Sequence, residues 1–284
     1  MSEWKNILKK PKDLKLFIIH TGFVHMAGNI HVNRKSSKFK SFPKDDRFNP
    51  VFAYLVEHPE QGYLLLDTGL HSSFSQSRFG NFGFLLGGVV KTKTEAGMDV
   101  VSRLGSINVA PQKISKIVLS HLHLDHTSGL PHFKDNGDLK VYIDPDEIDS
   151  GEALFGLFKG YIKKQRQGMR IEPIAYSKNA PPFIHAWDVF HDQSVFIVRT
   201  PGHTPGHVSA LLNMSGGPLF LTFDVAHRKV NIDETIPTKG DYDQSMASIE
   251  AFKVFLKIAP ETRVIYGHDP DQLGSLKLLP DYYT

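Results

Sequence analysis

The 284-residue sequence contains no cysteine, which excludes disulfide bonds and thiolate ligation of a metal. Any metal ion must therefore be held by nitrogen and oxygen atoms. The longest apolar runs, such as LFII at 16–19 and LLL at 64–66, are too short to span a bilayer. The N-terminal segment MSEWKNILKK lacks the pattern of a secretory signal. We therefore expect a cytoplasmic protein with no membrane partner.

Neither sign of charge predominates, because 33 Lys and Arg residues stand against 30 Asp and Glu, for a net charge of +3. This balance creates no strong field, so no nucleic-acid partner is expected. The apolar fraction of 40 % is enough to fill a core. Histidine, with fifteen copies, is the abundant functional residue.

Short β-rich segments alternate with helical ones. Strands are expected at 14–20, 51–58, 62–69, 113–121, 139–144, 194–200, 207–214, 218–223 and 262–268, and helices at 94–107, 146–160 and 243–258. This order suits two packed β-sheets with helices outside. Because no Pro/Gly/Ser linker divides the chain, we expect one domain over 1–284, with 1–13 as an N-terminal extension carrying a short packed helix.

The strongest local motif is SHLHLDHTSG at 120–129, which places four potential ligands within six residues. A strand points residues i and i+2 to one face, so His121 and His123 can bind one ion. Asp125 and His126 follow where the chain turns toward a helix, and they can reach a second ion. A purely structural role would require several ionisable groups to be desolvated together without a cation, which is costly.

Three more candidate ligands follow predicted strands. His203 lies in RTPGHTPGH (199–207), Asp224 follows PLFLTF, and His268 follows TRVIYG. Strand ends that converge at one edge of a sheet are a usual place for a site. Each residue alone would more often be a turn or cap residue, but together they are specific for metal ligation.

The seven ligands divide into two ion sites. The first ion is assigned to His121, His123 and His203, the second to Asp125, His126 and His268, and Asp224 is assigned to bridge both. Zinc is the expected metal, although cobalt, manganese or iron could occupy the same ligands. Two cations about 3.5–4 Å apart can share a water and lower its pKa from about 16 toward about 7.

Two further polar residues have supporting interpretations. His207, the second histidine of GHTPGH, is interpreted as a structural residue or a partner of a ligand. Asp67, in LLLDTG, is expected to accept a hydrogen bond from a ligand histidine and so fix its tautomer. A cap of the DTG turn is the alternative role for Asp67.

From about residue 14 to the C-terminus, the chain resembles the metallo-β-lactamase superfamily, on HLHLDH, GHTPGH, the aspartate at a strand end and YGHD. The resemblance implies an α+β fold, an αββα sandwich of two mixed β-sheets flanked by helices. Within the superfamily, the motifs LLLDTG, SHLHLDHTSG, TPGHTPGH, GHD and LLPDYY are similar to those of the N-acyl-homoserine lactone lactonases, which quench quorum sensing. That similarity implies hydrolytic opening of the lactone ring and a possible homodimer.

One position departs from those lactonases, which often have a tyrosine three residues after the bridging aspartate. Here that residue is His227, which can also donate a hydrogen bond to a carbonyl or an oxyanion; a surface histidine is the alternative. The expected mechanism is attack of a metal-bridging hydroxide on the lactone carbonyl. The first ion and His227 then stabilise the oxyanion, and Asp125 passes a proton to the departing ring oxygen.

An apolar groove is expected for the acyl chain. Its candidate walls are Phe23 and Met26, in the loop after the first strand, and Phe82 and Phe84, in the Gly- and Phe-rich segment 79–90. That segment is expected to be an ordered apolar loop, and core filling is an equally plausible role for it.

Other functions stay open. A glyoxalase-II-like thioesterase has overlapping motifs but would act on an anionic glutathione thioester, and no basic cluster for that substrate can be located. A phosphotriesterase or arylesterase is a further enzyme class. A metal-binding or redox scaffold without turnover is the non-enzyme reading, and the complete ligand set with open coordination positions argues against it.

Overall fold

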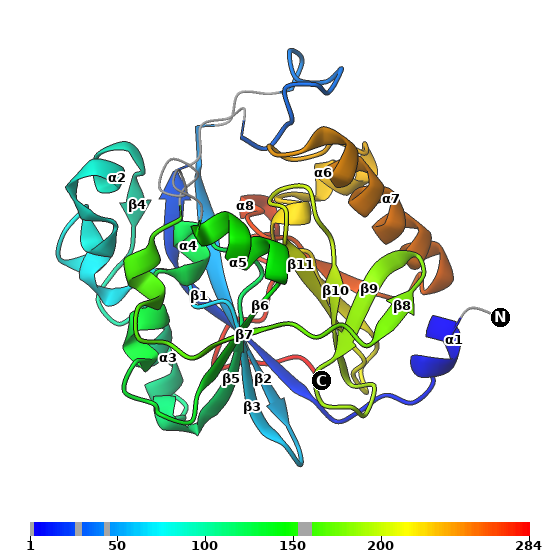
Figure 1. Cartoon of the computed structure of the whole chain (residues 1–284), viewed down its shortest axis with the longest axis horizontal. Coiled ribbons are helices and arrows are strands. Elements are labelled where there is room, and N and C mark those ends of the chain that lie inside the picture. The colour runs from blue at the N-terminus through cyan, green and yellow to red at the C-terminus, as the bar shows by residue number, and fades with distance from the viewer. Residues whose placement is uncertain (1–2, 26–29, 43–45, 153–160) are drawn as a thin grey trace.

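The computed structural model describes residues 3–25, 30–42, 46–152 and 161–284. Two mixed β-sheets pack face to face (Figure 1). The first sheet, in the order β4-β1-β2-β3-β5-β6-β7, consists of β1 (Lys15–His25), β2 (Phe48–His58), β3 (Gly62–Leu66), β4 (Thr92–Lys93), β5 (Ile114–Val118), β6 (Lys140–Ile143) and β7 (Ile171–Pro173). Its strands β3, β5, β6 and β7 are parallel to one another, and the rest pair antiparallel.

The second sheet has the order β13-β12-β11-β10-β9-β8. It consists of β8 (Lys178–Ala180), β9 (Phe183–Asp188), β10 (Val195–Arg199), β11 (Val208–Leu212), β12 (Leu219–Leu221) and β13 (Arg263–Ile265). Only β12 and β13 pair in parallel among the described strands of this sheet. Because β10 and β12 both run antiparallel to β11, the chain leaves β10, β12 and β13 at the same edge.

Helices flank the outer faces of the sheets or lie at their edges. They are α1 (Glu3–Ile7), α2 (Gly83–Val89), α3 (Val100–Gly105), α4 (Leu124–Thr127), α5 (Pro145–Glu152), α6 (Lys229–Asp233), α7 (Tyr242–Ile258) and α8 (Pro270–Leu273). Figure 1 shows α2 and α3 on the side of the first sheet and α7, in orange, on the side of the second. Two mixed sheets flanked by helices are the arrangement expected from the order of predicted elements.

The strand sequences explain the layers. In β1, Leu16 and Ile18 belong to the buried cluster between the sheets, together with Ile197 of β10. The alternate residues Phe17 and Ile19 belong to the cluster on the outer face of the first sheet, which α3 also joins. Successive side chains of a strand point to opposite faces, and here both faces are buried, so alternate residues of β1 belong to different apolar clusters.

The outer face of the second sheet packs on α7 and α1. Phe196 and Phe220 from the sheet meet Phe252 from α7 in one buried cluster. Trp4 of α1 joins it with its ring centroid 5.1 Å from that of Phe196, and its Nε1–H donates to Pro181 O at 3.0 Å. The short N-terminal helix is therefore packed on the body, as expected.

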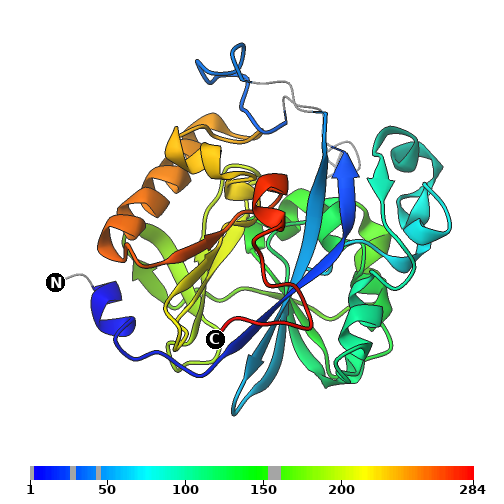
Figure 2. The same cartoon turned by 180° about the vertical axis from the view of Figure 1, so that it is seen from behind.

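The C-terminal segment forms backbone hydrogen bonds along one side of β1. Leu279 N donates to Ile18 O and Tyr283 N donates to Leu16 O, both at 2.9 Å, so the segment runs beside β1. Figure 2 shows this red segment crossing the molecule below α8. No helix of the described residues is long and apolar enough to span a membrane.

Several predicted boundaries differ from the structure. Strand β1 continues to His25, so Phe23 lies in that strand and not in the loop after it. Segment 79–90 is not a loop throughout, because α2 follows a 3₁₀ turn at Gly80–Phe82. The helix predicted over 94–107 begins only at Val100, where the Asp99 side chain caps the helix by accepting from Ser102 N. Of the helix predicted over 146–160, the structure describes α5, and 153–160 lie outside the described residues.

Candidate metal centre

The histidine-rich loop leaves the first sheet at the end of β5 and is held there by Asp67. Asp67 follows β3, the parallel neighbour of β5, so the carboxyl ends of the two strands lie side by side. Its two oxygens accept from the backbone N and the Oγ of Ser120, each at 2.7 Å. Asp67 Oδ2 also lies 2.7 Å from His126 Nδ1. This is the predicted contact to a ligand histidine, and it leaves His126 Nε2 available as a ligand atom.

The first group of candidate ligands consists of His121, His123, His203 and Asp224. His123 Nδ1 lies 2.9 Å from both His121 Nε2 and His203 Nε2, and His203 Nε2 lies 3.2 Å from Asp224 Oδ2. One nitrogen of His123 carries either one proton or one lone pair, so it cannot satisfy both neighbouring rings. A cation among the three nitrogens would satisfy all of them.

The second group consists of Asp125, His126 and His268. His268 Nε2 lies 3.6 Å from Asp125 Oδ2 and 3.1 Å from Asp224 Oδ1. Four buried atoms that converge here have no hydrogen-bond partner among the described residues: Asp125 Oδ2, His126 Nε2, Asp224 Oδ1 and His268 Nε2. Unpaired buried polar atoms are costly. Their convergence is what a divalent cation would resolve, so these residues fit a metal ion.

Asp224 stands between the two groups with one oxygen toward each. Oδ2 faces His203 and Oδ1 faces His126 at 3.4 Å and His268. Burial alone would raise the pKa of this carboxyl, but His268, His126 and other imidazoles hold that pKa well below its usual value. The division into two groups joined by one carboxylate coincides with the assignment made from the sequence.

Each group takes side chains from the edges of both sheets. His121 and His123 follow β5 of the first sheet, whereas His203 follows β10 of the second. The second group likewise combines His126, in the short helix α4 after β5, with His268, which follows β13.

The surroundings favour neutral imidazole in the first group. Burial lowers the pKa of His123 to about 4 and lowers the pKa values of His121 and His203 well below the usual value. In the second group burial acts in the same direction, but Asp224 and Asp125 outweigh it and raise the pKa values of His126 and His268. A cation would compete with a proton for those two nitrogens.

Backbone and hydroxyl acceptors orient two of the ligand rings. His268 Nδ1 lies 2.8 Å from Pro50 O, an acceptor only, so Nδ1 carries the proton and Nε2 faces the site. His203 Nδ1 lies 3.3 Å from Thr238 Oγ1, and that hydroxyl donates to Asp224 O at 3.0 Å. The hydroxyl therefore accepts from His203 and leaves its Nε2 as the ligand atom.

His207 supports the centre without joining either group. Its Nδ1 lies 3.1 Å from Thr200 O, and its Nε2 accepts from Asp224 N at 3.0 Å. The structure thus agrees with the interpretation of His207 as a structural residue, since both of its ring nitrogens are used to place the backbone of Asp224.

Glu147 of α5 ties two ligand loops together, and sequence reasoning did not single it out. Its fully buried carboxylate accepts from Leu122 N through Oε1 at 2.9 Å and from Gly206 N through Oε2 at 3.1 Å. Leu122 lies between His121 and His123, and Gly206 is in the loop of His203. Burial raises the pKa of Glu147, and these hydrogen bonds oppose the rise.

The close approach of α5 explains a glycine in the motif GHTPGH. A Cβ on Gly206 would lie 2.3 Å from Glu147 N and 2.6 Å from Asp144 Oδ1. No side chain fits in that space, so only glycine lets the start of α5 reach the loop.

His227 lies inside the centre rather than on the surface. It is fully buried, its Nε2 lies 3.1 Å from Asp224 Oδ2, and its Nδ1 lies 3.0 Å from His31 Nδ1. Its ring centroid is 5.3 Å from that of His203 and 5.4 Å from that of His268. The imidazole is therefore positioned between the two ligand groups.

A cavity of about 460 Å³ opens on the first group. His123 and His203 contribute to its wall, with Tyr161, Lys239 and Gln244 among the other lining residues. It is the described cavity in which a substrate would meet the candidate ligands.

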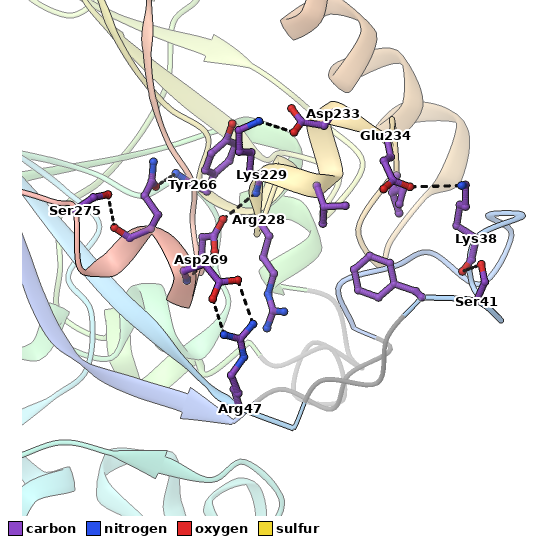
Figure 3. Close-up of a pocket in the computed structure, with 15 residues that line it drawn as sticks. Lys38, Ser41, Arg47, Arg228, Lys229, Asp233, Glu234, Tyr266, Asp269 and Ser275 are labelled. Carbon is purple, nitrogen blue, oxygen red and sulfur yellow. Dashed lines mark hydrogen bonds and ion pairs between the residues drawn. The ribbon is translucent and has the colours of Figure 1, made fainter.

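A larger cavity of about 850 Å³ contains none of the seven ligands among its described lining residues. Figure 3 shows Arg228, Lys229 and Tyr266 along its wall. In the sequence, the first two follow His227 and the third precedes His268 by two residues. Its exposed charges pair with one another, as Figure 3 shows for Lys229 with Asp233. We therefore assign the chemistry to the smaller cavity.

The residues predicted to form the acyl-chain groove are scattered. Phe82 is buried against Phe74, with ring centroids 4.4 Å apart, and Phe84 is 82 % exposed. Phe23 packs edge to face on His20 at 4.6 Å. Among the described residues, none of the three predicted phenylalanines lines either cavity. Met26 lies outside the described residues.

His20, outside both ligand groups, gives a pH-dependent stability. Burial lowers its pKa from 6.5 to about 4, so the folded protein favours the neutral ring. Its contribution is present above pH 6.5 and is lost as the pH falls toward 4, because the unfolded chain binds the proton first. We expect wild type to lose on the order of 2 kcal/mol more stability than His20→Phe between pH 7 and pH 5.

Chemical denaturation of the metal-free proteins at both pH values measures this difference. Metal-free samples are needed because acid also releases ligand histidines from an ion. An equal pH dependence in the two proteins would contradict the assignment to His20.

A family model for the metallo-beta-lactamase superfamily matches residues 46–268. The chain belongs to this superfamily, and the αββα fold expected from the resemblance is confirmed. Within it, the chain is similar to curated N-acyl homoserine lactonases. It is 30 % identical over 237 residues to that of Bacillus sp, covering 82 % of this chain and 86 % of that protein. It is 26 % identical to AttM of Azorhizobium caulinodans, covering 95 % and 99 %.

Solved structures have the same fold. An N-acyl homoserine lactone hydrolase with the product N-hexanoyl-L-homoserine at its catalytic metal centre superposes with a TM-score of 0.78 at 24 % identity, covering 96 % of this chain and 100 % of that one. AidC, a dizinc quorum-quenching lactonase, superposes with a TM-score of 0.63 at 18 % identity, covering 92 % and 89 %. Together with the two ligand groups, the family supports binding of divalent metal ions.

Proposed function

We propose that this protein is a metal-dependent hydrolase that opens the lactone ring of N-acyl homoserine lactones, and that the seven predicted ligands hold its two ions. One observation carries the proposal. The two ligand groups share the carboxylate of Asp224, whose Oδ2 faces His203 and whose Oδ1 faces His268, in a chain similar over most of its length to N-acyl homoserine lactonases. Two divalent ions in such groups supply an activated water at neutral pH and polarise the carbonyl that it attacks.

In this proposal Asp125 moves the proton. Hydrolysis adds a hydroxyl group to the acyl carbon and a proton to the ring oxygen, so one group must carry a proton from the water to the leaving side. Asp125 belongs to the second ligand group, so it would lie beside the attacking water and the ring oxygen. A carboxylate placed this way can accept a proton from the water and return it to the ring oxygen as the C–O bond breaks.

His227 is the proposed donor for the developing oxyanion. Its Nε2 is on the side of Asp224, 3.1 Å from Oδ2, between the two ligand groups. A fixed N–H in a buried site stabilises negative charge more strongly than a donor in water does. The acyl amide and chain would lie in the cavity lined by Tyr161 and Lys239.

Zinc is the proposed metal because the groups offer imidazole and carboxylate atoms and no thiolate. A homodimer and a cytoplasmic location remain predictions based on the resemblance and on the N-terminal sequence.

The direct test is pH-stat titration of protein with known metal content against an N-acyl homoserine lactone. We expect acid release with the metal-loaded protein, loss of that release after EDTA treatment and recovery when Zn²⁺ is restored. A glutathione thioester assayed in parallel separates the rival hydrolase. A clear preference for the thioester would overturn the lactonase proposal, and no turnover of any ester by the metal-loaded protein would favour a binding scaffold.

A further inference from the structure

We propose that Arg228 and His31 fix the tautomer of His227, so that its Nε2 carries a proton pointing at Asp224. The two residues would act as positioning residues, and His227 would be held as a hydrogen-bond donor. The consequence for turnover rests on the proposed lactonase function, whereas the tautomer itself can be measured without any substrate.

Four buried side chains form a line that ends at the bridging carboxylate. Arg228 Nη2 lies 3.3 Å from His31 Nε2, and His31 Nδ1 lies 3.0 Å from His227 Nδ1. His227 Nε2 then lies 3.1 Å from Asp224 Oδ2. Both histidines are fully buried and Arg228 is 7 % exposed, so no bulk water intervenes along this line.

The direction of every hydrogen bond in the line follows from its first member. A guanidinium group only donates, so His31 Nε2 must accept and carries no proton. A neutral His31 then has its proton on Nδ1 and donates to His227 Nδ1. His227 Nδ1 therefore accepts and its proton is on Nε2. That N–H points at Asp224 Oδ2 and would be shared with the developing oxyanion in the proposed reaction. Any other arrangement of two neutral rings would place two donors or two lone pairs against each other.

The anchor of this line is itself held in place. The same Nη2 atom of Arg228 donates to Asn49 Oδ1 at 2.6 Å. Asn231 donates to the backbone oxygen of His31 at 2.9 Å, which holds the second ring. Figure 3 shows Arg228 along the wall of the larger cavity, whose described lining residues include none of the seven candidate ligands.

The line of hydrogen bonds would select one of the two tautomers that a neutral histidine can adopt at this position. A side chain with one polar atom, such as a neutral phenol, would carry its proton in one place only. A neutral imidazole can carry its proton on either nitrogen, and only one of these forms donates toward Asp224. Arg228 and His31 would remove this ambiguity.

Nitrogen-15 NMR of histidine-labelled protein tests the tautomer directly. The ring shifts of a protonated and an unprotonated nitrogen differ widely, and His227→Gln identifies the signals of His227 by their loss. We expect Nε2 of His227 to be the protonated nitrogen in the zinc-loaded protein. A signal pattern with the proton on Nδ1 would overturn the proposal even if the protein opens lactones.

A nearly isosteric pair of variants tests the role in turnover. In His31→Asn the amide Nδ2 takes the place of Nδ1 and still donates, whereas His31→Asp offers only acceptors. We expect His31→Asn to retain most of the kcat and His31→Asp to lose about 100-fold in kcat with little change in KM, as for the loss of one oxyanion donor. Zinc content and the NMR tautomer are measured on both proteins. Equal losses in the two variants, or an Nε2 proton that persists in His31→Asp, would contradict the proposal.

A second pair covers the case in which His31→Asp does not fold. Arg228→Lys keeps a cationic donor, and Arg228→Met removes it at similar length. We expect the methionine variant to show both tautomers of His227 and a lower kcat, and the lysine variant to restore the single tautomer. A single Nε2–H tautomer in Arg228→Met would show that the arginine does not set it. If metal-loaded wild type showed that tautomer but opened no lactone, only the proposed function would fail.

Discussion

Replacing Asp224 by alanine is expected to lower kcat/KM about a thousandfold or more and to reduce bound metal from two ions per chain to one at most. Both ligand groups depend on this one side chain, since Oδ2 faces His203 and Oδ1 faces His268. A metal ion contributes several kcal/mol of charge stabilisation in the transition state, and each 1.4 kcal/mol is a factor of about ten in rate.

Steady-state kinetics and elemental analysis of the same preparation measure both effects. Asp233→Ala is the matched control, because Asp233 is a half-exposed aspartate nearby in sequence that forms an ion pair with Lys229 and belongs to neither ligand group. It should keep two ions and wild-type kinetics. An Asp224→Ala protein that still holds two ions and works at a normal rate would show that this carboxylate does not bridge the site.

Glu147→Gln is expected to weaken binding of the first ion by about 10- to 100-fold and to leave the second ion nearly unaffected. The carboxylate accepts one backbone N–H through each oxygen, from Leu122 and from Gly206. Whichever oxygen becomes NH₂, that group faces a donor, which leaves a buried N–H unpaired. The loops that move carry His123 and His203, whereas His126 is held separately by Asp67.

Competition between the metal-free protein and a chelator, followed by the absorption of bound Co²⁺, resolves the two binding steps. Glu152→Gln is the control, since it makes the same chemical change in the same helix at an exposed side chain paired with Lys163 and Arg166. Excess metal should restore activity to Glu147→Gln. Equal loss of affinity at both ions would mean that the fold as a whole was disturbed.

The grouping of the candidate ligands could be predicted from the sequence because their signal is local. His121 and His123 are two residues apart in an extended segment, and Asp224 and His268 come just after apolar strands. The layers were predictable from the order of the elements, because strands are followed by helices in both halves of the chain. The sequence shows that the candidate ligands follow strands, and the pairing of those strands brings their ends to one edge.

The remaining features depend on contacts between distant segments. Glu147 is one of four acids in DPDEID, and nothing in that run distinguishes it from its neighbours. His31 and His227 meet across 196 positions of sequence, so neither predicts the other. The glycine-rich composition of segment 79–90 predicted a loop, whereas the structure has the helix α2 there. It packs so closely that a Cβ on Gly87 would lie 2.7 Å from Phe79 Cα, which explains why small residues occur there.

Because each ligand group joins the edges of both sheets, a bound ion is also a cross-link between the two layers of the sandwich. His123 and His203 are 80 positions apart, and an ion held between them closes that length of chain. Removing the ions would therefore weaken the contact between the two sheets as well as abolish hydrolysis. Amide protons near the ends of β5 and β10 would then exchange faster with solvent. Part of the free energy of metal binding would then contribute to the free energy of folding.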